Sequence, residues 1–262
     1  MTTTALPAKP TISLESLGLA SPDKPSEVCM DWTRQKFIMT GPSKSGKTKF
    51  WAMNPKTYFV KLESGHNHVV HNGTECRTFQ EVMTLKNKIF QAVKAGIWPY
   101  DTIVFDTGDR LLDYITEDVI LLAQDKYKKA EINGIGDIPE GNGWFMLKTK
   151  VNLFLKQLEE LPCAVVLIFH VTTDQREDQV GKYTIETINV GGKSGKAILA
   201  WADHVLHVRA TTVGDKAMRK LLTRGTRNIE AGNRAGLPPE MPWVESDKEN
   251  FQKFQAHFKI AA

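Results

Sequence analysis

A short glycine-rich segment constrains the fold of this chain more than any other feature. Residues 41–48 read Gly-Pro-Ser-Lys-Ser-Gly-Lys-Thr and match the pattern G-x-x-x-x-G-K-[ST] in full. The segment directly follows Lys36–Thr40, a largely apolar run that predicts a β-strand, and a helix start follows it. In that context the pattern is typical of a loop whose backbone N–H groups surround phosphate oxygens. The sequence therefore predicts a strand–loop–helix unit that binds a nucleoside triphosphate.

The residue types in this loop suit phosphate and metal binding. Two glycines leave room for backbone N–H groups to turn towards the β-phosphate, where a side chain would clash. Lys47 supplies a positive charge to the β- and γ-phosphates, and the Thr48 hydroxyl is a ligand for Mg²⁺. The predicted cofactors are therefore ATP and Mg²⁺. The predicted nucleotide-binding residues are Gly41, Pro42, Ser43, Lys44, Ser45, Gly46, Lys47 and Thr48.

A second glycine-rich segment, residues 191–196, has a similar composition. Ala197 stands where the pattern requires Ser or Thr, and Val190 stands where it requires the first glycine. The segment therefore does not qualify as a second phosphate-binding loop.

Short apolar runs alternate along the chain with segments of helical spacing. Further strands are predicted at Thr57–Leu62, Asp101–Phe105 and Cys163–Phe169, and helices at Phe79–Lys94, Arg110–Ala130 and Phe145–Leu161. This alternation predicts an α/β domain with a mostly parallel, twisted sheet. The almost wholly apolar run at 163–169 is typical of a strand that has both faces covered by helices.

The last third of the chain changes character. His204–Arg209 and Met218–Thr223 flank a turn around Gly214 and Asp215, which predicts a C-terminal antiparallel hairpin. Two stretches, Ile132–Gly143 and Thr172–Gly195, show neither the helical nor the strand spacing of apolar residues and are predicted to be long loops.

The two ends of the chain differ in composition from its centre. Residues 1–30 are rich in Thr, Ser and Pro and predict a flexible N-terminal arm. Residues 31–240 are predicted to form the nucleotide-binding domain, and residues 241–262 a C-terminal tail.

The composition indicates the cellular environment. The chain has three cysteines, which cannot all pair in disulfides, and it has no C-x-x-C motif. This cysteine usage favours a reducing compartment. No signal-peptide pattern begins the sequence, and its longest apolar stretch is too short to span a bilayer. We therefore expect a cytoplasmic protein with no membrane partner. The net charge of +4 says little, but seven Lys or Arg stand against two acids between His207 and Arg234, which indicates a phosphate-facing surface, with an ordinary solvated surface as the alternative.

Three polar residues follow predicted strands at the edge of the sheet where a ligand is expected. Asp106 fits the carboxylate that supports Mg²⁺, with a helix cap as the alternative. Glu63 is the candidate general base, with an ordinary surface glutamate as the alternative. His170 is placed to sense the γ-phosphate, with a buried structural histidine as the alternative.

The order of these elements resembles the RecA-like branch of P-loop ATPases, in which a catalytic glutamate follows the second strand. The segment from Gly191 to Arg209 is similar to the recombinase segment in which a glycine-rich loop leads through a helix into a strand. Residues 224–238, which end in Asn-Arg-Ala-Gly-Leu-Pro, are similar to a segment of phage-encoded RecA-like ATPases. Those ATPases include single-strand annealing proteins related to recombinases.

The resemblance implies a RecA-like core and a set of catalytic roles. Arg227 or Arg234 would reach the γ-phosphate bound to a neighbouring subunit. Thr172–Val190 would be the DNA-binding loop, although it contains acids beside its bases. His170 departs from the family pattern, since bacterial recombinases carry glutamine there. The implied catalytic residues are Lys47, Glu63, Asp106, His170, Arg227 and Arg234.

The function implied by the resemblance is a Mg²⁺-dependent ATPase that binds single-stranded DNA and promotes annealing or homologous recombination. Such a protein would be phage-encoded and act in the cytoplasm of a bacterial host as a homo-oligomeric ring or filament, with a single-strand-binding protein as a further candidate partner. A replication-associated helicase or loader, or an ATP-dependent assembly switch with little turnover, remains the alternative. A GTPase is disfavoured because no N-K-x-D motif follows the core, whereas a small-molecule kinase stays open.

Overall fold

The structure is a computed structural model that describes residues 15–19, 27–63, 69–128, 130–213, 216–244 and 246–260. Most of the arm predicted for residues 1–30 lies outside the described residues, as does the turn at Gly214 and Asp215. Within the described chain, no helix is both long and apolar enough to cross a membrane.

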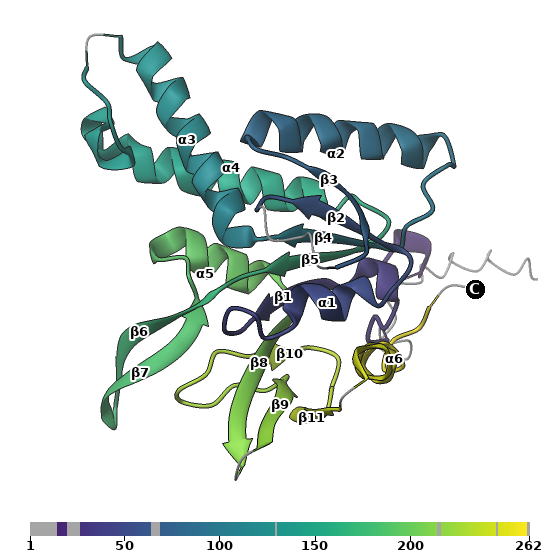
Figure 1. The fold of residues 1–262 in the computed structure, drawn as a ribbon. Helices are drawn as coiled ribbons and strands as arrows, with labels where there is room; N and C mark the ends of the chain where they lie inside the picture. Colours follow the sequence, from purple (N-terminus) through teal and green to yellow (C-terminus); the bar gives the residue numbers. More distant parts are fainter. Residues whose placement is uncertain are drawn as a thin grey trace, which may run out of the picture.

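A mostly parallel sheet forms the centre of the fold (Figure 1). Its strand order is β11-β9-β8-β1-β5-β4-β2-β3, and β10 pairs with β8. The strands from β8 to β3 are parallel, whereas β9, β10 and β11 join antiparallel. Their bounds are β1 Lys36–Thr40, β2 Thr57–Lys61, β3 Asn72–Glu75, β4 Thr102–Asp106, β5 Ala164–Ile168, β8 His204–Val213, β9 Lys216–Leu222, β10 Gly232–Asn233 and β11 Glu240–Trp243.

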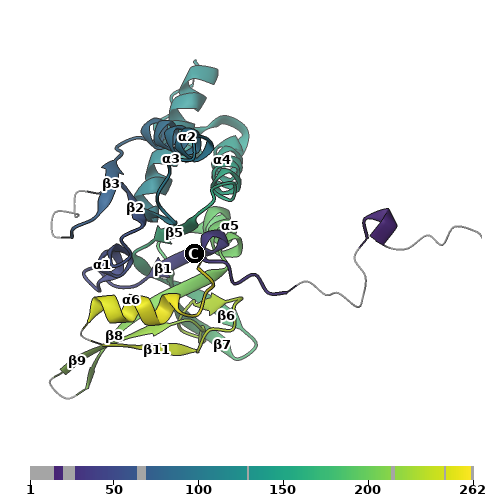
Figure 2. The same ribbon diagram turned by 90° about the vertical axis from the view of Figure 1, so that its right-hand side faces the viewer.

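Helices cover both faces of this sheet (Figure 2). The bounds are α1 Lys47–Ala52, α2 Phe79–Lys94, α3 Gly108–Lys126, α4 Asn142–Leu158, α5 Gly192–Trp201 and α6 Asp247–Gln255. One core cluster joins α2, α3, α4 and α5 to one face, and a second joins α1 and α6 to the other. Every residue of β4 and β5 is buried, because a central parallel strand faces apolar side chains on both sides. The predicted α/β class and the antiparallel hairpin β8–β9 are confirmed.

The stretch Thr172–Gly195 differs from the long loop predicted for it. Most of it forms an antiparallel hairpin of β6 (Val171–Asp178) and β7 (Gly181–Ile188), which projects from the body of the molecule (Figure 1). The outer part of this hairpin is largely exposed, so the sequence lacks the apolar alternation of a half-buried strand. Only towards the base do Ile185 and Ile188 become buried.

The stretch Ile132–Gly143, also predicted to be a long loop, contains short helical turns that its Gly-rich and polar composition does not indicate. It contains two 3₁₀ turns, Ile135–Asp137 and Pro139–Gly141. Ile132 and Ile138 are buried and pack on the outer end of α3. These apolar contacts fix the path of the chain from α3 to α4.

The described residues after 240 pack on the core. Phe254 of α6 is fully buried, with its ring 5.6 Å from Phe37 of β1 and 6.2 Å from Trp32. Phe258 lies 5.4 Å from Trp32, and Lys259 forms a bridge with Asp31. The C-terminal segment therefore covers the face of the sheet that carries α1.

Candidate nucleotide-binding site

The glycine-rich loop connects β1 to α1 at the carboxyl end of the parallel strands. Gly41 has φ +150°, and a Cβ there would lie 2.9 Å from the carbonyl oxygen of Val208 on the neighbouring strand β8. Gly46 has φ +97°, a conformation that side-chain-bearing residues rarely adopt. The two glycines of the motif are therefore required by the close packing and the backbone turn of this loop.

Lys47 is buried and folds back over its own loop. Its Nζ donates hydrogen bonds to the carbonyl oxygens of Gly41 at 2.7 Å and Pro42 at 2.8 Å. Burial lowers the pKa of Lys47, and the nearby carboxylates of Asp106, Asp109 and Glu63 oppose this shift. The ammonium group of Lys47 thus lies against the loop, with these three carboxylates near it.

The loop residues present fit a triphosphate with Mg²⁺. Ser45 Oγ is buried and, among the described residues, has no hydrogen-bond partner. The Thr48 hydroxyl donates to Asp106 Oδ2 at 2.6 Å, so the loop and the end of β4 meet at one point. A hydroxyl and a carboxylate at this place are the oxygen donors that Mg²⁺ takes beside phosphate. Thr48 and Asp106 would hold the metal, and residues 41–48 would hold the phosphates.

Glu63 lies at the same edge of the sheet. It follows β2, and because β2 pairs with β4 in the register Lys61↔Asp106, Glu63 is brought beside the end of β4. Its Oε1 accepts a hydrogen bond of 2.5 Å from the hydroxyl of Thr107, which also caps α3. The carboxylate is exposed and held in a defined position beside the phosphate loop.

His170 follows β5, and its neighbour is an acid that the sequence did not single out. The backbone N–H of His170 donates to Asp109 Oδ2 at 2.8 Å, and its Nδ1 lies 3.2 Å from the same oxygen. Burial raises the pKa of Asp109, and the contacts with His170 oppose this shift. Asp109 therefore fixes His170 beside the end of β4.

Arg227 and Arg234, of which one is expected to reach a neighbouring subunit's γ-phosphate, lie away from the phosphate loop of their own chain. Arg227 donates to Asp178 Oδ1 and to the carbonyl oxygen of Gly181, both at 3.0 Å, and its guanidinium lies 4.8 Å from the centre of the Tyr183 ring. Arg227 therefore packs against the β6–β7 hairpin and stabilises its turn.

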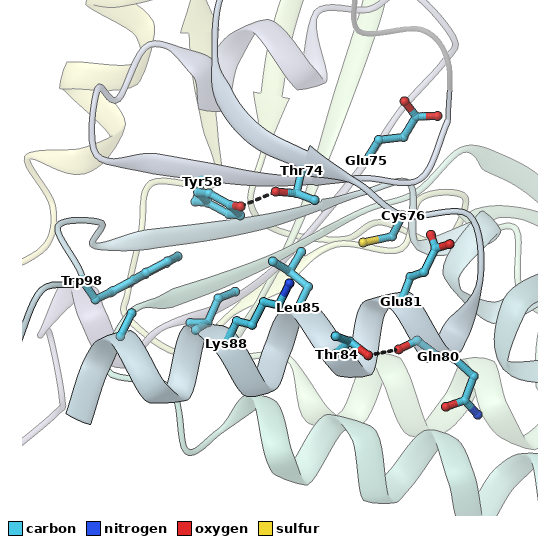
Figure 3. Close-up of a pocket in the computed structure, with 12 residues that line it drawn as sticks. Tyr58, Thr74, Glu75, Cys76, Gln80, Glu81, Thr84, Leu85, Lys88 and Trp98 are labelled. Atoms are coloured by element: carbon cyan, nitrogen blue, oxygen red, sulfur yellow. Dashed lines mark hydrogen bonds between the residues drawn. The ribbon is translucent and has the colours of Figure 1, made fainter. Parts of the chain in front are cut away.

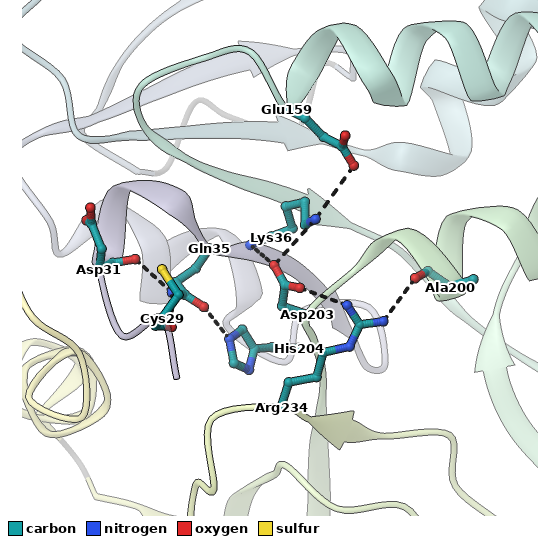
Figure 4. A network of polar contacts seen from close by, with 9 residues as sticks. All are labelled: Cys29, Asp31, Gln35, Lys36, Glu159, Ala200, Asp203, His204 and Arg234. Carbon is teal, nitrogen blue, oxygen red and sulfur yellow. Dashed lines mark hydrogen bonds and ion pairs between the residues drawn. The ribbon is translucent and has the colours of Figure 1, made fainter. Parts of the chain in front are cut away.

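Arg234 belongs to a separate polar network (Figure 4). It donates to Asp203 Oδ1 at 3.0 Å and to the carbonyl oxygen of Ala200 at 3.3 Å. Asp203 also accepts from the backbone N–H of Lys36, the first residue of β1. This network therefore lies at the end of β1 opposite to the phosphate loop.

Three residues near the site have no recognisable sequence signal of their own. Thr107 caps α3 and Asp109 lies in its first turn, so both reach the site only because α3 begins directly after β4. Arg219 of β9 reaches the loop from the antiparallel hairpin, with Nη1 3.4 Å from the position of a Cβ on Gly46. Arg219 is 113 residues away from Asp106 in sequence, so only the strand order brings it near.

A groove of about 580 Å³ lies elsewhere, between β3 and α2 at the edge of the sheet (Figure 3). Tyr58, Cys76 and Trp98 line it together with polar residues of α2. None of the predicted phosphate-site residues lines this groove.

The α/β fold and the meeting of the glycine-rich loop with Asp106 at the ends of parallel strands together define a P-loop nucleotide-binding domain. A family model described as an AAA domain matches residues 33–235, and the chain belongs to this family. Among solved structures, the chain is similar to a KaiC-like protein from the hyperthermophilic archaeon Pyrococcus horikoshii OT3, with 13% identity and a TM-score of 0.45. That match covers 82% of this chain and 87% of the other. A comparison with curated proteins gave no match.

Proposed function

We propose that this protein is a Mg²⁺-dependent ATPase that binds single-stranded DNA and promotes annealing or recombination. The observation that carries the ATPase part is the meeting of three strand ends at the phosphate loop. Lys47 provides the positive charge for the phosphates, Thr48 and Asp106 provide oxygen donors for Mg²⁺, and Glu63 provides a base at the same edge.

Bound Mg²⁺ would neutralise charge that develops on the β- and γ-phosphates. Glu63 accepts the proton of the attacking water, and its hydrogen bond to Thr107 holds the carboxylate in place for that task. His170, whose position Asp109 fixes, follows β5 at the same edge of the sheet and would sense the γ-phosphate.

The DNA part of the proposal rests on a second cavity, of about 860 Å³, between α3, α4 and the start of α5. Trp144 and Phe145 line it, and these residues are 62% and 69% exposed. Lys148 and Lys193 lie on the same cavity beside the glycine-rich segment that opens α5. Exposed aromatic rings stack on bases and lysines bind phosphates, which is the usual composition of a single-strand binding surface.

An assembly of several subunits is also part of the proposal. Because Arg227 and Arg234 lie away from the phosphate loop of their own chain, either would act only on a neighbour's nucleotide. An arginine supplied in this way raises phosphoryl-transfer rates by ~10³–10⁵. We propose that a homo-oligomeric ring or filament completes each site, which makes the isolated subunit a slow ATPase.

The functional test compares two DNA reactions under the same conditions. Complementary labelled oligonucleotides are mixed with the protein, Mg²⁺ and ATP, and a preformed duplex with a single-stranded tail is treated in parallel. Faster pairing without strand displacement supports the annealing function. Displacement of the duplexed strand would instead indicate a helicase-like motor, and an effect on neither reaction would contradict the DNA part of the proposal.

A further inference from the structure

His207 is a buried histidine that connects the phosphate loop to the β6–β7 hairpin. It lies on β8 opposite Thr40, the last residue of β1, and its side chain is 1% exposed. Its Nδ1 is 3.0 Å from Thr40 Oγ1, and its Nε2 is 3.2 Å from Glu186 Oε2 on β7. Thr40 immediately precedes Gly41, whose carbonyl oxygen accepts a hydrogen bond from Lys47. One imidazole therefore links the residue that precedes the phosphate loop to the β6–β7 hairpin.

The partners of this ring select its tautomer. Burial lowers the pKa of His207, although Glu186 opposes the shift, so the neutral imidazole is favoured. A neutral imidazole has one N–H donor and one acceptor nitrogen, and a carboxylate only accepts. Nε2–H therefore donates to Glu186, and the Thr40 hydroxyl donates to Nδ1. The carbonyl oxygen of Leu206, 3.3 Å from Thr40 Oγ1, is a second acceptor for the same hydroxyl.

Glu186 belongs to the hairpin. Its side chain is 46% exposed, and its backbone holds the turn at Asn228–Glu230 by two hydrogen bonds of 2.8 Å. Glu230 in turn pairs with Arg176 of β6 at 2.8 Å. A displacement of β7 therefore moves Glu186, whereas His207 stays within the sheet.

We propose that His207 is a positioning residue that couples the β6–β7 hairpin to the phosphate loop by exchanging its tautomer. With Glu186 in place, the proton is on Nε2 and Thr40 donates to Nδ1. When Glu186 withdraws, the buried Nε2–H loses its acceptor, which is unfavourable. The proton leaves Nε2 for solvent and another binds Nδ1, so the charge is unchanged. Nδ1–H then donates to Thr40 Oγ1, and the Thr40 hydroxyl donates to the carbonyl oxygen of Leu206, so this tautomer makes two hydrogen bonds where the Nε2–H tautomer makes one.

The coupling is reciprocal, because two sites that bias one equilibrium affect each other equally. Nucleotide binding at residues 41–48 favours one orientation of the Thr40 hydroxyl and hence one position of Glu186. The inference goes beyond the proposed function, since it requires neither hydrolysis nor DNA at the hairpin.

Histidine ¹⁵N NMR of the nucleotide-free protein tests the tautomer, with a His207→Gln spectrum to identify the signal among the seven histidines. We expect Nε2–H in the wild type and in Glu186→Gln, whose amide oxygen still accepts, and Nδ1–H in Glu186→Ala. Glu177→Ala, which removes another exposed acid of the hairpin, is the matched control and is expected to keep Nε2–H. An unchanged tautomer in Glu186→Ala would overturn the proposal.

Hydrogen–deuterium exchange of β7 amides, with and without Mg²⁺ and a non-hydrolysable ATP analogue, tests the coupling. We expect the nucleotide to change exchange in the wild type, Glu186→Gln and Glu177→Ala, and this response to be lost in Glu186→Ala and His207→Phe. Glu186→Ala changes a half-exposed side chain, so it remains informative if His207→Phe does not fold. The coupling would be contradicted if the analogue did not change the exchange of β7 amides in the wild type, or if it still changed that exchange in Glu186→Ala. Either result would count whatever the protein does with DNA.

Discussion

Thr48 Oγ1 donates a hydrogen bond of 2.6 Å to Asp106 Oδ2, and this bond joins the phosphate loop to the end of β4. The same two oxygens are the ones that the proposed Mg²⁺ site uses. The carboxylate is therefore placed to hold the Thr48 hydroxyl and to attract the metal. Their separation in sequence, 58 residues, is bridged by the pairing of β1, β5 and β4.

Asp106→Asn is expected to weaken the metal site while leaving the loop in place. Removing the charge while keeping an oxygen should raise the Mg²⁺ concentration for half-maximal ATPase activity by roughly 10- to 100-fold. A Mg²⁺ titration of activity measures this shift. Asp113→Asn, on the exposed side of α3, is the control. Equal Mg²⁺ dependence in wild type and Asp106→Asn would remove Asp106 from the metal site.

Glu63→Gln separates hydrolysis from binding. The amide still accepts the hydrogen bond from Thr107 but cannot take a proton, so turnover should fall by roughly 10²–10⁴. Affinity for a fluorescent ATP analogue should stay within about twofold. Glu117→Gln changes an exposed glutamate of α3 and should leave turnover unchanged. Turnover that persists in Glu63→Gln would show that Glu63 is not the base.

Trp144→Ala tests the proposed single-strand surface. Loss of one stacked base is worth about 1–3 kcal/mol, which corresponds to a Kd for labelled single-stranded DNA raised by roughly 5- to 150-fold. Fluorescence anisotropy at fixed salt measures it, since phosphate contacts depend strongly on ionic strength. Leu121→Ala, another exposed apolar residue, is the control. The same Kd for both variants would place the DNA elsewhere.

His204 makes the stability of the protein depend on pH. Burial lowers its pKa from 6.5 to about 4, and its Nε2 lies 2.8 Å from Gln35 Oε1. In the unfolded chain this histidine is protonated as the pH falls below about 6.5, whereas in the folded chain it stays neutral down to about pH 4. The contribution of His204 to the free energy of unfolding is therefore fully present above pH 6.5 and is lost as the pH falls. The free energy of unfolding should drop by about 2 kcal/mol between pH 7 and 5 through this group.

Urea denaturation at the two pH values measures this loss. His204→Gln should lose less stability on acidification than the wild type does, whatever its stability at pH 7. His257→Gln changes an exposed histidine and is the control. Equal pH dependence in His204→Gln and wild type would show that His204 does not cause the loss.

The fold could be predicted from the sequence wherever one local pattern decides the structure. The bounds of β1 and α2 agree with the residue patterns, because an apolar strand before a glycine loop and a 16-residue amphipathic helix need no distant partner to be recognised. Strand β3 was not predicted, since its residues Asn72–Glu75 are polar and mostly exposed at the edge of the sheet. Its pairing with β2 is a tertiary contact that periodicity does not reveal.

The candidate site also contains residues that could be predicted from the sequence and residues that could not. The loop at 41–48 and the polar residues at the carboxyl ends of β2, β4 and β5 followed from the rule that ligands bind at this end of parallel strands. Asp109, Thr107 and Arg219 did not follow, because their nearness to the loop depends on how α3 begins after β4 and on the order of β8 and β9. The sequence also did not reveal that Arg227 contacts Asp178 and Gly181 of the β6–β7 hairpin in its own chain.

The rate of ATP hydrolysis per subunit, measured across a protein concentration series with and without single-stranded DNA, tests the central claim most directly. The account predicts a low rate at low concentration, a rise as subunits assemble, and a further rise with single-stranded DNA. Glu63→Gln should stay inactive throughout the series. A rate that is independent of both protein concentration and DNA would contradict the account.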